Sequence, residues 1–280
     1  MPGANARALE KAKSLPADTL ILDLEDAVAP EGKADAREAI RSAVGDRAYG
    51  AREVVIRING LDTEWGRDDI TMAAAAGVDG VLVPKIMRGK DVRVINRILN
   101  DAGASPGLDL WVMIETPLAI LNIRKIAKAS AKTRLAGFVM GTNDLAKAFN
   151  AVPTPDRLAF LFSLSAAVAA ARAYGLVAVD GVYNDIGNEA GLSAECEQGR
   201  VLGFDGKTLI HPGQVETANR VFSPSEAELS HARQIVEAFA LPENRGKGVI
   251  SLHGQMVELL HLAQAERVIA IDDAIRQIAS

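Results

Sequence analysis

The chain has 280 residues, of which 49% are apolar, and a formal net charge of -5. Its basic residues are scattered rather than clustered, which argues against a nucleic-acid-binding protein. The single cysteine, Cys196, excludes an intrachain disulfide, and no segment is long and apolar enough to span a bilayer. We therefore expect a soluble, cytoplasmic protein without an export signal, and we expect neither nucleic acid nor a membrane as its partner.

Strand-like apolar segments alternate with helix-like segments along most of the chain. A short amphipathic helix is expected first, over Ala4–Ser14, because Pro16 ends its pattern. Strands are expected at Thr19–Leu24, Val54–Ile58, Val81–Pro84, Val177–Val182 and Lys207–Ile210, at Leu135–Gly141, and in the stretch Leu110–Pro117, whose apolar run ends in Glu115. Helices are expected at Ala34–Val44, Asp68–Ala76 and Lys90–Asn100, after Pro117, and at Asp156–Tyr174. This rhythm is typical of βαβ units and predicts a parallel sheet.

The predicted fold class is α/β, with a TIM (β/α)8-type barrel over residues 1–222. A closed barrel of this type needs eight strands, whereas seven are visible, and the first element is a helix. We therefore expect the first strand of the barrel to be absent from the N-terminus. After Phe222 the composition changes, and a helix is expected from about Ser225 to Phe239. We interpret residues 223–280 as a helical C-terminal extension that packs on the barrel mouth or on a neighbouring subunit.

Charged and polar residues follow several predicted strands where their apolar character ends. They are Glu25 and Asp26, then Arg57, Lys85 and Glu115, and finally Thr142, Asn143 and Asp144. In parallel α/β proteins, ligands gather at the carboxyl ends of the strands. Mg²⁺ takes only one or two protein carboxylates, so Glu115 and Asp144 predict a magnesium site. The alternative is that these acids cap the helices that follow, but a third acidic strand end at Glu25 favours the metal site.

Two basic residues among these strand ends allow more than one interpretation. The guanidinium of Arg57 suits bidentate recognition of a carboxylate, although a structural ion pair with Glu115 or Asp26 is compatible with that role. Lys85 has the position of a Schiff-base lysine, yet a nearby metal makes that chemistry unnecessary, so an electrostatic or structural role is favoured.

For four further residues, the sequence pattern allows a purely structural role. Arg7 and Lys11 lie one helical turn apart, which suits phosphate contacts but more often indicates a solvated face. His211 follows a strand and is either a base or a structural histidine. Cys196, flanked by Glu195 and Glu197, is most simply a packed thiol.

The motifs at successive strand ends resemble those of the citrate lyase beta subunit-like and malyl-CoA lyase family within the HpcH/HpaI aldolases. In order they are Leu24-Glu25-Asp26-Ala27-Val28, Arg57-Ile58-Asn59-Gly60, Pro84-Lys85, Ile114-Glu115-Thr116-Pro117, Gly141-Thr142-Asn143-Asp144-Leu145 and Gly203-Phe204-Asp205-Gly206-Lys207. The resemblance covers nearly the whole chain. It departs at the start, where the family has a strand before Pro2-Gly3, and near the C-terminus, where Glu258 and His253 occupy positions that are often Asp.

This resemblance implies a TIM barrel with a C-terminal helical lid, in a homotrimer or a multiple of it. It implies that Glu115 and Asp144 are Mg²⁺ ligands, with Thr142 and Asn143 at the substrate. It also implies catalytic roles for Arg57, which would bind the α-keto acid carboxylate and the developing oxyanion, and for Glu25 and Asp26, which would support the waters of the metal. Arg7 and Lys11 would contact the phosphates of CoA, and Glu258 would serve as an acid/base in a neighbouring subunit.

Three functions follow from these expectations. The first is a Mg²⁺-dependent carbon–carbon lyase that cleaves a malyl-CoA or citramalyl-CoA type substrate to an α-keto acid and an acyl-CoA. The second keeps the same site but hydrolyses the thioester. The third is a citrate lyase beta-like subunit that works on a carrier-bound acyl group within a complex.

Overall fold

The computed structural model of the chain describes residues 1–45 and 48–279. The chain forms two compact units, Met1–Ala218 and Asn219–Ser280. Within the described residues, no helix is long and apolar enough to cross a membrane.

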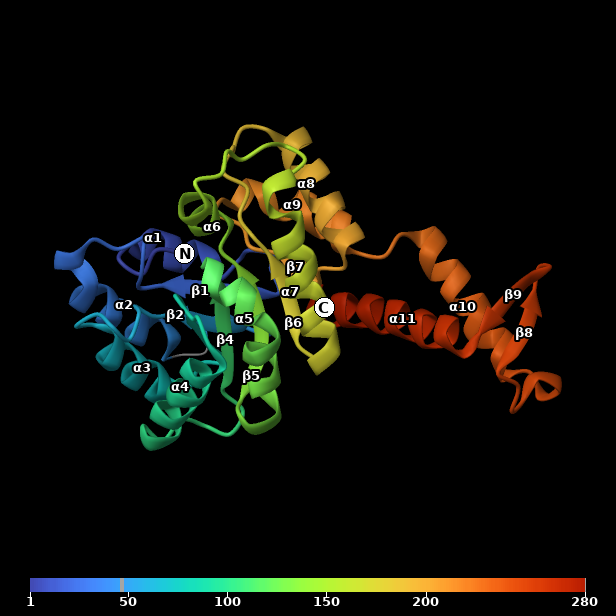
Figure 1. Cartoon of the computed structure of the whole chain (residues 1–280), viewed down its shortest axis with the longest axis horizontal. Coiled ribbons are helices and arrows are strands. Elements are labelled where there is room, and N and C mark those ends of the chain that lie inside the picture. The colour runs from blue at the N-terminus through green and yellow to red at the C-terminus, as the bar shows by residue number, and fades with distance from the viewer. Residues whose placement is uncertain (46–47, 280) are drawn as a thin grey trace. The chain divides into compact units, whose positions relative to one another are not determined.

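The first unit is built on one parallel sheet of seven strands that are paired in sequence order (Figure 1). These strands are β1 (Thr19–Asp23), β2 (Glu53–Arg57), β3 (Gly80–Val83), β4 (Asp109–Ile114), β5 (Leu135–Met140), β6 (Val177–Asp180) and β7 (Gly206–Lys207). The α-helices are α1 (Ala6–Ala12), α2 (Lys33–Val44), α3 (Gly66–Ala75), α4 (Gly89–Asp101), α5 (Pro117–Ala127), α6 (Thr142–Phe149), α7 (Leu161–Tyr174) and α8 (Glu189–Leu202), while α9 (Val215–Phe222) begins in the first unit and ends in the second. The predicted alternation of strands and helices is therefore confirmed.

Two predicted elements are shorter in the structure than in the sequence pattern. The helix expected from Asp156 begins only at Leu161, after the short 3-10 turn η3 (Leu158–Phe160). Arg157 is the reason, because its φ of 53° lies in the left-handed region and is incompatible with a right-handed helix. The last strand is also shorter than Lys207–Ile210, since only Gly206 and Lys207 pair with β6.

The seven described strands form a curled half-barrel rather than a closed eight-stranded barrel. In the described residues, β1 and β7 are the two edges of the sheet and do not pair with each other. The chain start lies along β1, where Pro2 forms a parallel bridge with Asp23. The Asp23 N–H donates to the Met1 carbonyl at 2.8 Å, and the Gly3 N–H donates to the Asp23 carbonyl at 2.8 Å. Closure into the predicted TIM barrel stays a prediction.

One face of the sheet carries a continuous apolar cluster. It consists of Val55, Leu82, Trp111, Met113 and Val139, with Ile21 and Val179 packed against it. Side chains alternate between the two faces of a strand, so the intervening residues Leu22, Ile56 and Val112 point the other way. These three are fully buried as well. Burial on both faces explains why the strands are almost entirely apolar.

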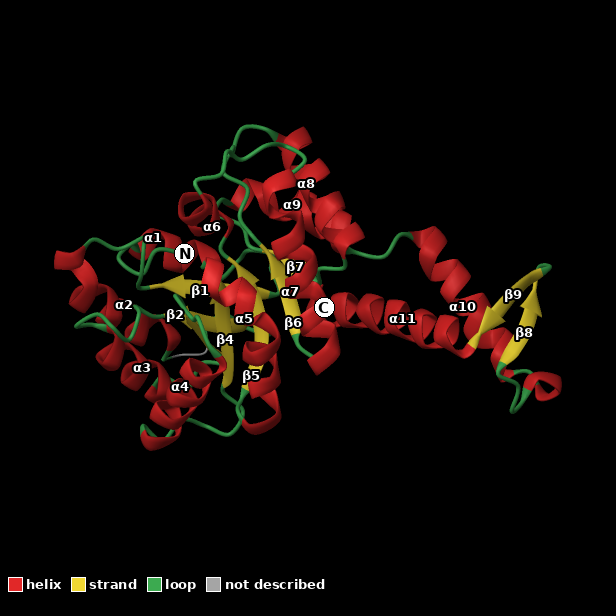
Figure 2. Cartoon of the chain, viewed as in Figure 1, coloured by secondary structure: helices red, strands yellow, loops and turns green. Residues whose placement is uncertain are grey.

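The second unit has a small core of its own. Helix α10 (Glu226–Ala240) begins at the predicted Ser225, whose side chain forms a capping box with Glu228. After α10 the chain forms an antiparallel hairpin, β8 (Val249–Leu252) and β9 (Gln255–Glu258), followed by helix α11 (Leu259–Ala279) (Figure 2). The core of the unit contains Ala232, Ile235, Ile250, Val257 and Ala265.

The packing of Trp111 gives a test of the apolar layer. A Cβ added to Gly137 would lie 2.8 Å from the Trp111 ring. We expect Gly137→Ala to lower the free energy of unfolding by about 1–3 kcal/mol in urea denaturation, because the indole must move. The matched control is Gly206→Ala, since no atom lies within 4 Å of the Cβ added there. Equal stability of the two variants would contradict the packing described.

Candidate active site

Strand alternation places a polar layer directly above the apolar cluster. On each of four strands, the residue two positions after a member of the apolar cluster lies on the same face of the sheet as the cluster. These residues are Asp23 after Ile21, Arg57 after Val55, Glu115 after Met113, and Gly141 after Val139. The site therefore begins where the apolar layer ends, at the carboxyl ends of the strands.

Arg57 joins β1 to β2 through a bidentate ion pair with Asp23. Its Nε lies 2.6 Å from Asp23 Oδ1, and its Nη2 lies 2.5 Å from Asp23 Oδ2. Burial tends to raise the pKa of Asp23, but the pairing with Arg57 and the N–H donors of Glu25 and Ala27 outweigh it and lower the pKa. The two guanidinium nitrogens expected to bind a substrate carboxylate thus bind Asp23 instead. The sequence pattern did not identify Asp23 as a site residue.

The remaining nitrogen of Arg57 faces the two acids of the loop after β1. Arg57 Nη1 lies 2.9 Å from Glu25 Oε2 and 3.4 Å from Asp26 Oδ2. The sequence anticipated a pair with Asp26, and the structure contains it as the longer of these two contacts. Because Asp23 binds Nε and Nη2, the Nη1 side of the guanidinium is the side that can face a ligand.

Glu25 is a buried carboxylate held in a fixed position. Its Oε2 has no hydrogen-bond partner, since the contact with Arg57 lacks hydrogen-bonding geometry. Its backbone carbonyl accepts from Lys33 Nζ at 2.7 Å. Burial raises the pKa of Glu25 to about 7, against the opposing effect of Arg57, and the charges of Asp26 and Glu115 add to the rise. Glu25 can therefore exchange a proton near neutral pH.

Glu115 and Asp144 share the cation Lys85. Glu115 is 1% exposed, and its Oε1 accepts from the Lys85 backbone N–H at 2.6 Å. Lys85 Nζ lies 2.5 Å from Asp144 Oδ1 and 3.6 Å from Glu115 Oε1. Burial raises the pKa of Glu115, although Lys85 opposes that rise. Lys85 has a φ of 56°, an uncommon backbone conformation that directs it to this contact. This geometry agrees with the electrostatic role favoured for Lys85.

The chemistry of this pair fits a divalent metal. Glu115 Oε2 is buried without a hydrogen-bond partner, so one oxygen of a charged group lacks compensation. A Cβ on Gly141 would lie 2.8 Å from this oxygen, so glycine is required beside it. Across residues 1–45 and 48–279 no group of three or more His, Cys, Asp or Glu could hold a metal. Two carboxylates suit Mg²⁺, whose other ligands are waters and substrate oxygens.

Thr142 and Asn143, which follow β5, are the first two residues of helix α6. Thr142 is its first residue, and Asn143 exchanges side-chain hydrogen bonds with Asn184, at 3.2 Å and 2.7 Å. This pair joins the start of α6 to the segment after β6. Asp144 follows in the same first turn, so the paired amides help to fix its backbone.

Three other predicted site residues lie outside this cluster. Arg7 and Lys11 are exposed on α1, whose start is capped by Asn5. Glu258 ends β9 in the second unit, and its backbone N–H donates to His261 Nδ1 at 3.0 Å. Their roles stay predictions.

His211 and Cys196 have structural environments. The His211 Nδ1 accepts from the Gly213 N–H at 3.1 Å and so caps a short 3-10 turn. Cys196 is fully buried, and burial raises the pKa of its thiol to about 11. Neither environment indicates a nucleophile or a base.

A buried ionic cluster near β6 and β7 was also missed. Arg157 Nη1 donates to both carboxylate oxygens of Asp180, at 2.8 and 2.7 Å, while Lys207 Nζ lies 2.6 Å from Glu195. Arg157 and Asp180 are 4% and 0% exposed. The polar ends of β6 and β7 offered a signal for Asp180 and Lys207. The loop position of Arg157 offered none.

Comparison with known proteins was made on sequence and on structure. The HpcH/HpaI aldolase/citrate lyase family matches residues 1–212. The (3S)-malyl-CoA thioesterase of Cereibacter sphaeroides is 48% identical over 275 residues, covering 98% of this chain and 93% of that protein. Citrate lyase subunit beta of Escherichia coli is 38% identical, covering 92% of this chain and 86% of that protein.

A solved structure shares both the fold and the length. CitE from Mycobacterium tuberculosis, in complex with magnesium, acetoacetate and coenzyme A, superposes with a TM-score of 0.77 at 28% identity, covering 96% of this chain and 95% of that chain. The family match, the relatives and the order of polar strand ends agree. This chain belongs to the HpcH/HpaI aldolase/citrate lyase family.

Proposed function

We propose that this chain is a Mg²⁺-dependent enzyme that hydrolyses a malyl-CoA-type thioester. The observation that carries the metal site is the buried, unpartnered oxygen of Glu115 beside Asp144 and Lys85. The choice of hydrolysis is supported by the (3S)-malyl-CoA thioesterases, which are 48% identical across 98% of the chain. Sequence reasoning placed the lyase first and the hydrolase second, and these relatives favour the reverse order.

Glu115 and Asp144 would hold the metal, and Arg57 Nη1 would face the substrate. When bound, Mg²⁺ supplies Lewis-acid polarisation and orients the carboxylate and hydroxyl oxygens of a malyl group. Lys85 pairs with both carboxylates, so a divalent ion competes with its ammonium group. Thr142 and Asn143 lie at the same strand end and would contact the substrate.

Glu25 is the proposed base for hydrolysis. Its Oε2, which accepts no hydrogen bond, and a pKa of about 7 allow it to accept a proton from water at neutral pH. The water oxygen bonds to the thioester carbonyl carbon, the carbon–sulfur bond breaks, and the proton passes from Glu25 to the CoA thiolate. The products are malate and CoA. Asp26, at 3.4 Å from Arg57, keeps the guanidinium turned toward this loop.

The carbon–carbon lyase is the second candidate, supported by the 38% identity to citrate lyase subunit beta. In this reaction a base removes the hydroxyl proton of the substrate, and the carbon–carbon bond breaks to an α-keto acid and the enolate of an acyl-CoA. Glu258 would then donate a proton to the enolate carbon, if the second unit of a neighbouring subunit reaches the site. This role of Glu258 requires an assembly of subunits, for which we propose a homotrimer. Likewise, the proposed contacts of Arg7 and Lys11 with CoA phosphates require a CoA substrate.

The metal site is tested by Glu115→Gln and Asp144→Asn. We expect each variant to bind Mg²⁺ at least about tenfold more weakly in calorimetric titration and to lose turnover of malyl-CoA, because each loses one of the two anionic ligands. Lys85→Gln keeps both carboxylates and removes the competing ammonium, so we expect it to bind Mg²⁺ at least as tightly as the wild type. Unchanged metal binding in both carboxylate variants would exclude this pair as the site.

The reaction outcome is tested by measuring products separately. Purified protein is incubated with malyl-CoA and Mg²⁺, and malate, glyoxylate, free CoA and acetyl-CoA are quantified by mass spectrometry. We expect malate and free CoA in equal amounts. Glyoxylate with acetyl-CoA would instead establish the lyase, and no turnover without a partner protein would favour a subunit that depends on a complex.

The raised pKa of Glu25 makes the stability of the metal-free protein depend on pH. Between its ordinary pKa of 4.5 and about 7, Glu25 holds a proton in the folded state but not in the unfolded chain. The free energy of unfolding therefore falls as pH rises through this range. We expect Glu25→Gln to reduce that slope in urea denaturation with EDTA, whereas Glu216→Gln, at an exposed position on α9, keeps it. An unchanged slope in Glu25→Gln would show that Glu25 is not the titrating group.

A further inference from the structure

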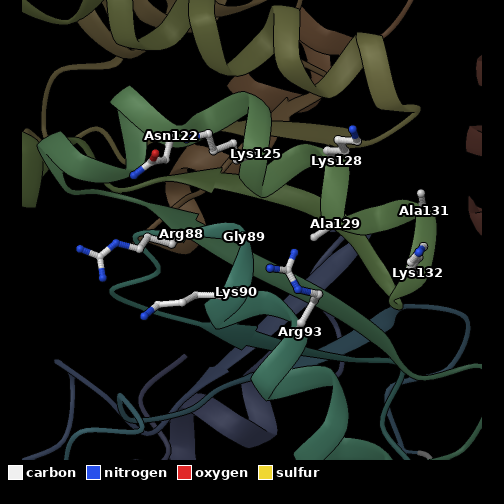
Figure 3. Close-up of a pocket in the computed structure, with 10 residues that line it drawn as sticks. All are labelled: Arg88, Gly89, Lys90, Arg93, Asn122, Lys125, Lys128, Ala129, Ala131 and Lys132. Carbon is white, nitrogen blue, oxygen red and sulfur yellow. The ribbon is translucent and has the colours of Figure 1, made fainter.

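A basic groove lies between α4 and α5, and none of the residues that line it belongs to the candidate active site. Figure 3 shows its two walls, one from the start of α4 and the other from α5 and the following 3-10 turn η2 (Lys128–Lys132). Six cations line it: Arg88, Lys90, Arg93, Lys125, Lys128 and Lys132. The hollow between the walls has a volume of about 640 Å³, and none of its ten lining residues is acidic.

Among the residues described, the six cations of the groove have no ion-pair partners, unlike the cations of the candidate active site. In the part of the chain that the structure describes, none of them lies within 4.0 Å of a carboxylate oxygen, whereas Arg57 and Lys85 pair with several. Like charges gathered around one hollow repel each other, and this cluster occurs in a chain with a net charge of -5. An anion in the hollow would relieve that repulsion.

The backbone adds to the positive potential. The first N–H groups of α4 have no intrahelical acceptors, and they lie at the positive end of the helix dipole. The nearest acid in the sequence, Asp91, does not line the hollow. Its carboxylate accepts from the N–H groups of Met87 at 3.1 Å and Arg88 at 2.8 Å. The walls are also fixed to each other, because Asn122 Nδ2 on α5 donates to the Met87 carbonyl at 3.1 Å.

The remaining lining residues indicate which class of anion fits. Apart from the cations and Asn122, the lining consists of Gly89, Ala129 and Ala131. It contains no aromatic ring for a nucleobase and no branched aliphatic side chain. Its volume falls within the range of roughly 300–1,000 Å³ that is typical of small-molecule sites. The ligand is therefore compact, hydrophilic and multiply charged.

We propose that this groove binds the oligophosphate chain of a small molecule, with cations from both helices contacting successive phosphate groups. Phosphates suit the arrangement because each offers several acceptor oxygens to lysine, guanidinium and helix N–H donors. Inorganic triphosphate and a nucleoside triphosphate share this chemistry, whereas the phosphates of a CoA substrate are assigned to Arg7 and Lys11. The inference does not rest on the proposed hydrolase activity.

The test compares two double variants on the same helices. Arg93→Gln with Lys125→Gln removes one cation from each wall. Arg97→Gln with Arg124→Gln removes the same charge from exposed positions of α4 and α5 that do not line the hollow. Binding of inorganic triphosphate to the full chain is measured by calorimetry at one fixed salt concentration. We expect one site in the wild type, at least about tenfold weaker binding in the groove variant, and a change below about twofold in the control, since only the former loses direct charge contacts.

Further ligands distinguish the sources of the phosphate chain and the competing explanations. Titrations with ATP and ADP show which molecule gains most from the groove, as the ratio of affinities between the wild type and the groove variant. A loss on the groove variant of about tenfold for any of these supports the site. Equal weakening by both double variants would overturn it in favour of non-specific attraction. Equally tight binding of a hexa-aspartate peptide would overturn it in favour of an acidic protein partner.

Discussion

Neutralisation of buried carboxylates is the constraint on which the candidate site depends. An ionised carboxylate removed from water is costly unless a cation and hydrogen bonds compensate it. Arg57 compensates Asp23 and faces Glu25, while Lys85 compensates Glu115 and Asp144. Arg57 on β2 meets Asp23 on the adjacent β1, whereas Lys85 after β3 contacts Glu115 after the adjacent β4 and reaches Asp144 after β5. The parallel order of the sheet therefore determines which charges meet.

The cations compensate Glu25 and Glu115 only in part, and these two acids are therefore the candidates for a chemical role. Glu25 and Glu115 each keep one buried oxygen without a hydrogen-bond partner, and each has a raised pKa because of burial. The charge of Glu115 also raises the pKa of Glu25. A site with one acid that can exchange a proton and another that can bind a metal suits a reaction needing both a base and a Lewis acid.

Between two of the helices that cover the sheet, cations rather than acids lack partners of opposite charge in the described part of the chain. Between α4 and α5 the cations have no acids, whereas at the carboxyl ends of the strands the acids exceed their cations. The segment from Lys85 to Arg88 leads from one region to the other, and Asn122 holds it to α5 through Met87. The chain thus has an excess of acids at the carboxyl ends of the strands and an excess of cations between two helices.

The sequence by itself determined the alternation of strands and helices, the family, and the acids at the strand ends, because hydrophobic periodicity and local motifs are written in consecutive residues. Asp23 was missed although it lies two residues after Ile21, since its role depends on facing Arg57 across neighbouring strands. Only the tertiary structure decided the late start of α7, the shared contact of Lys85 and the groove between α4 and α5. These depend on segments far apart in the chain, whose meeting is fixed by packing and not by local pattern.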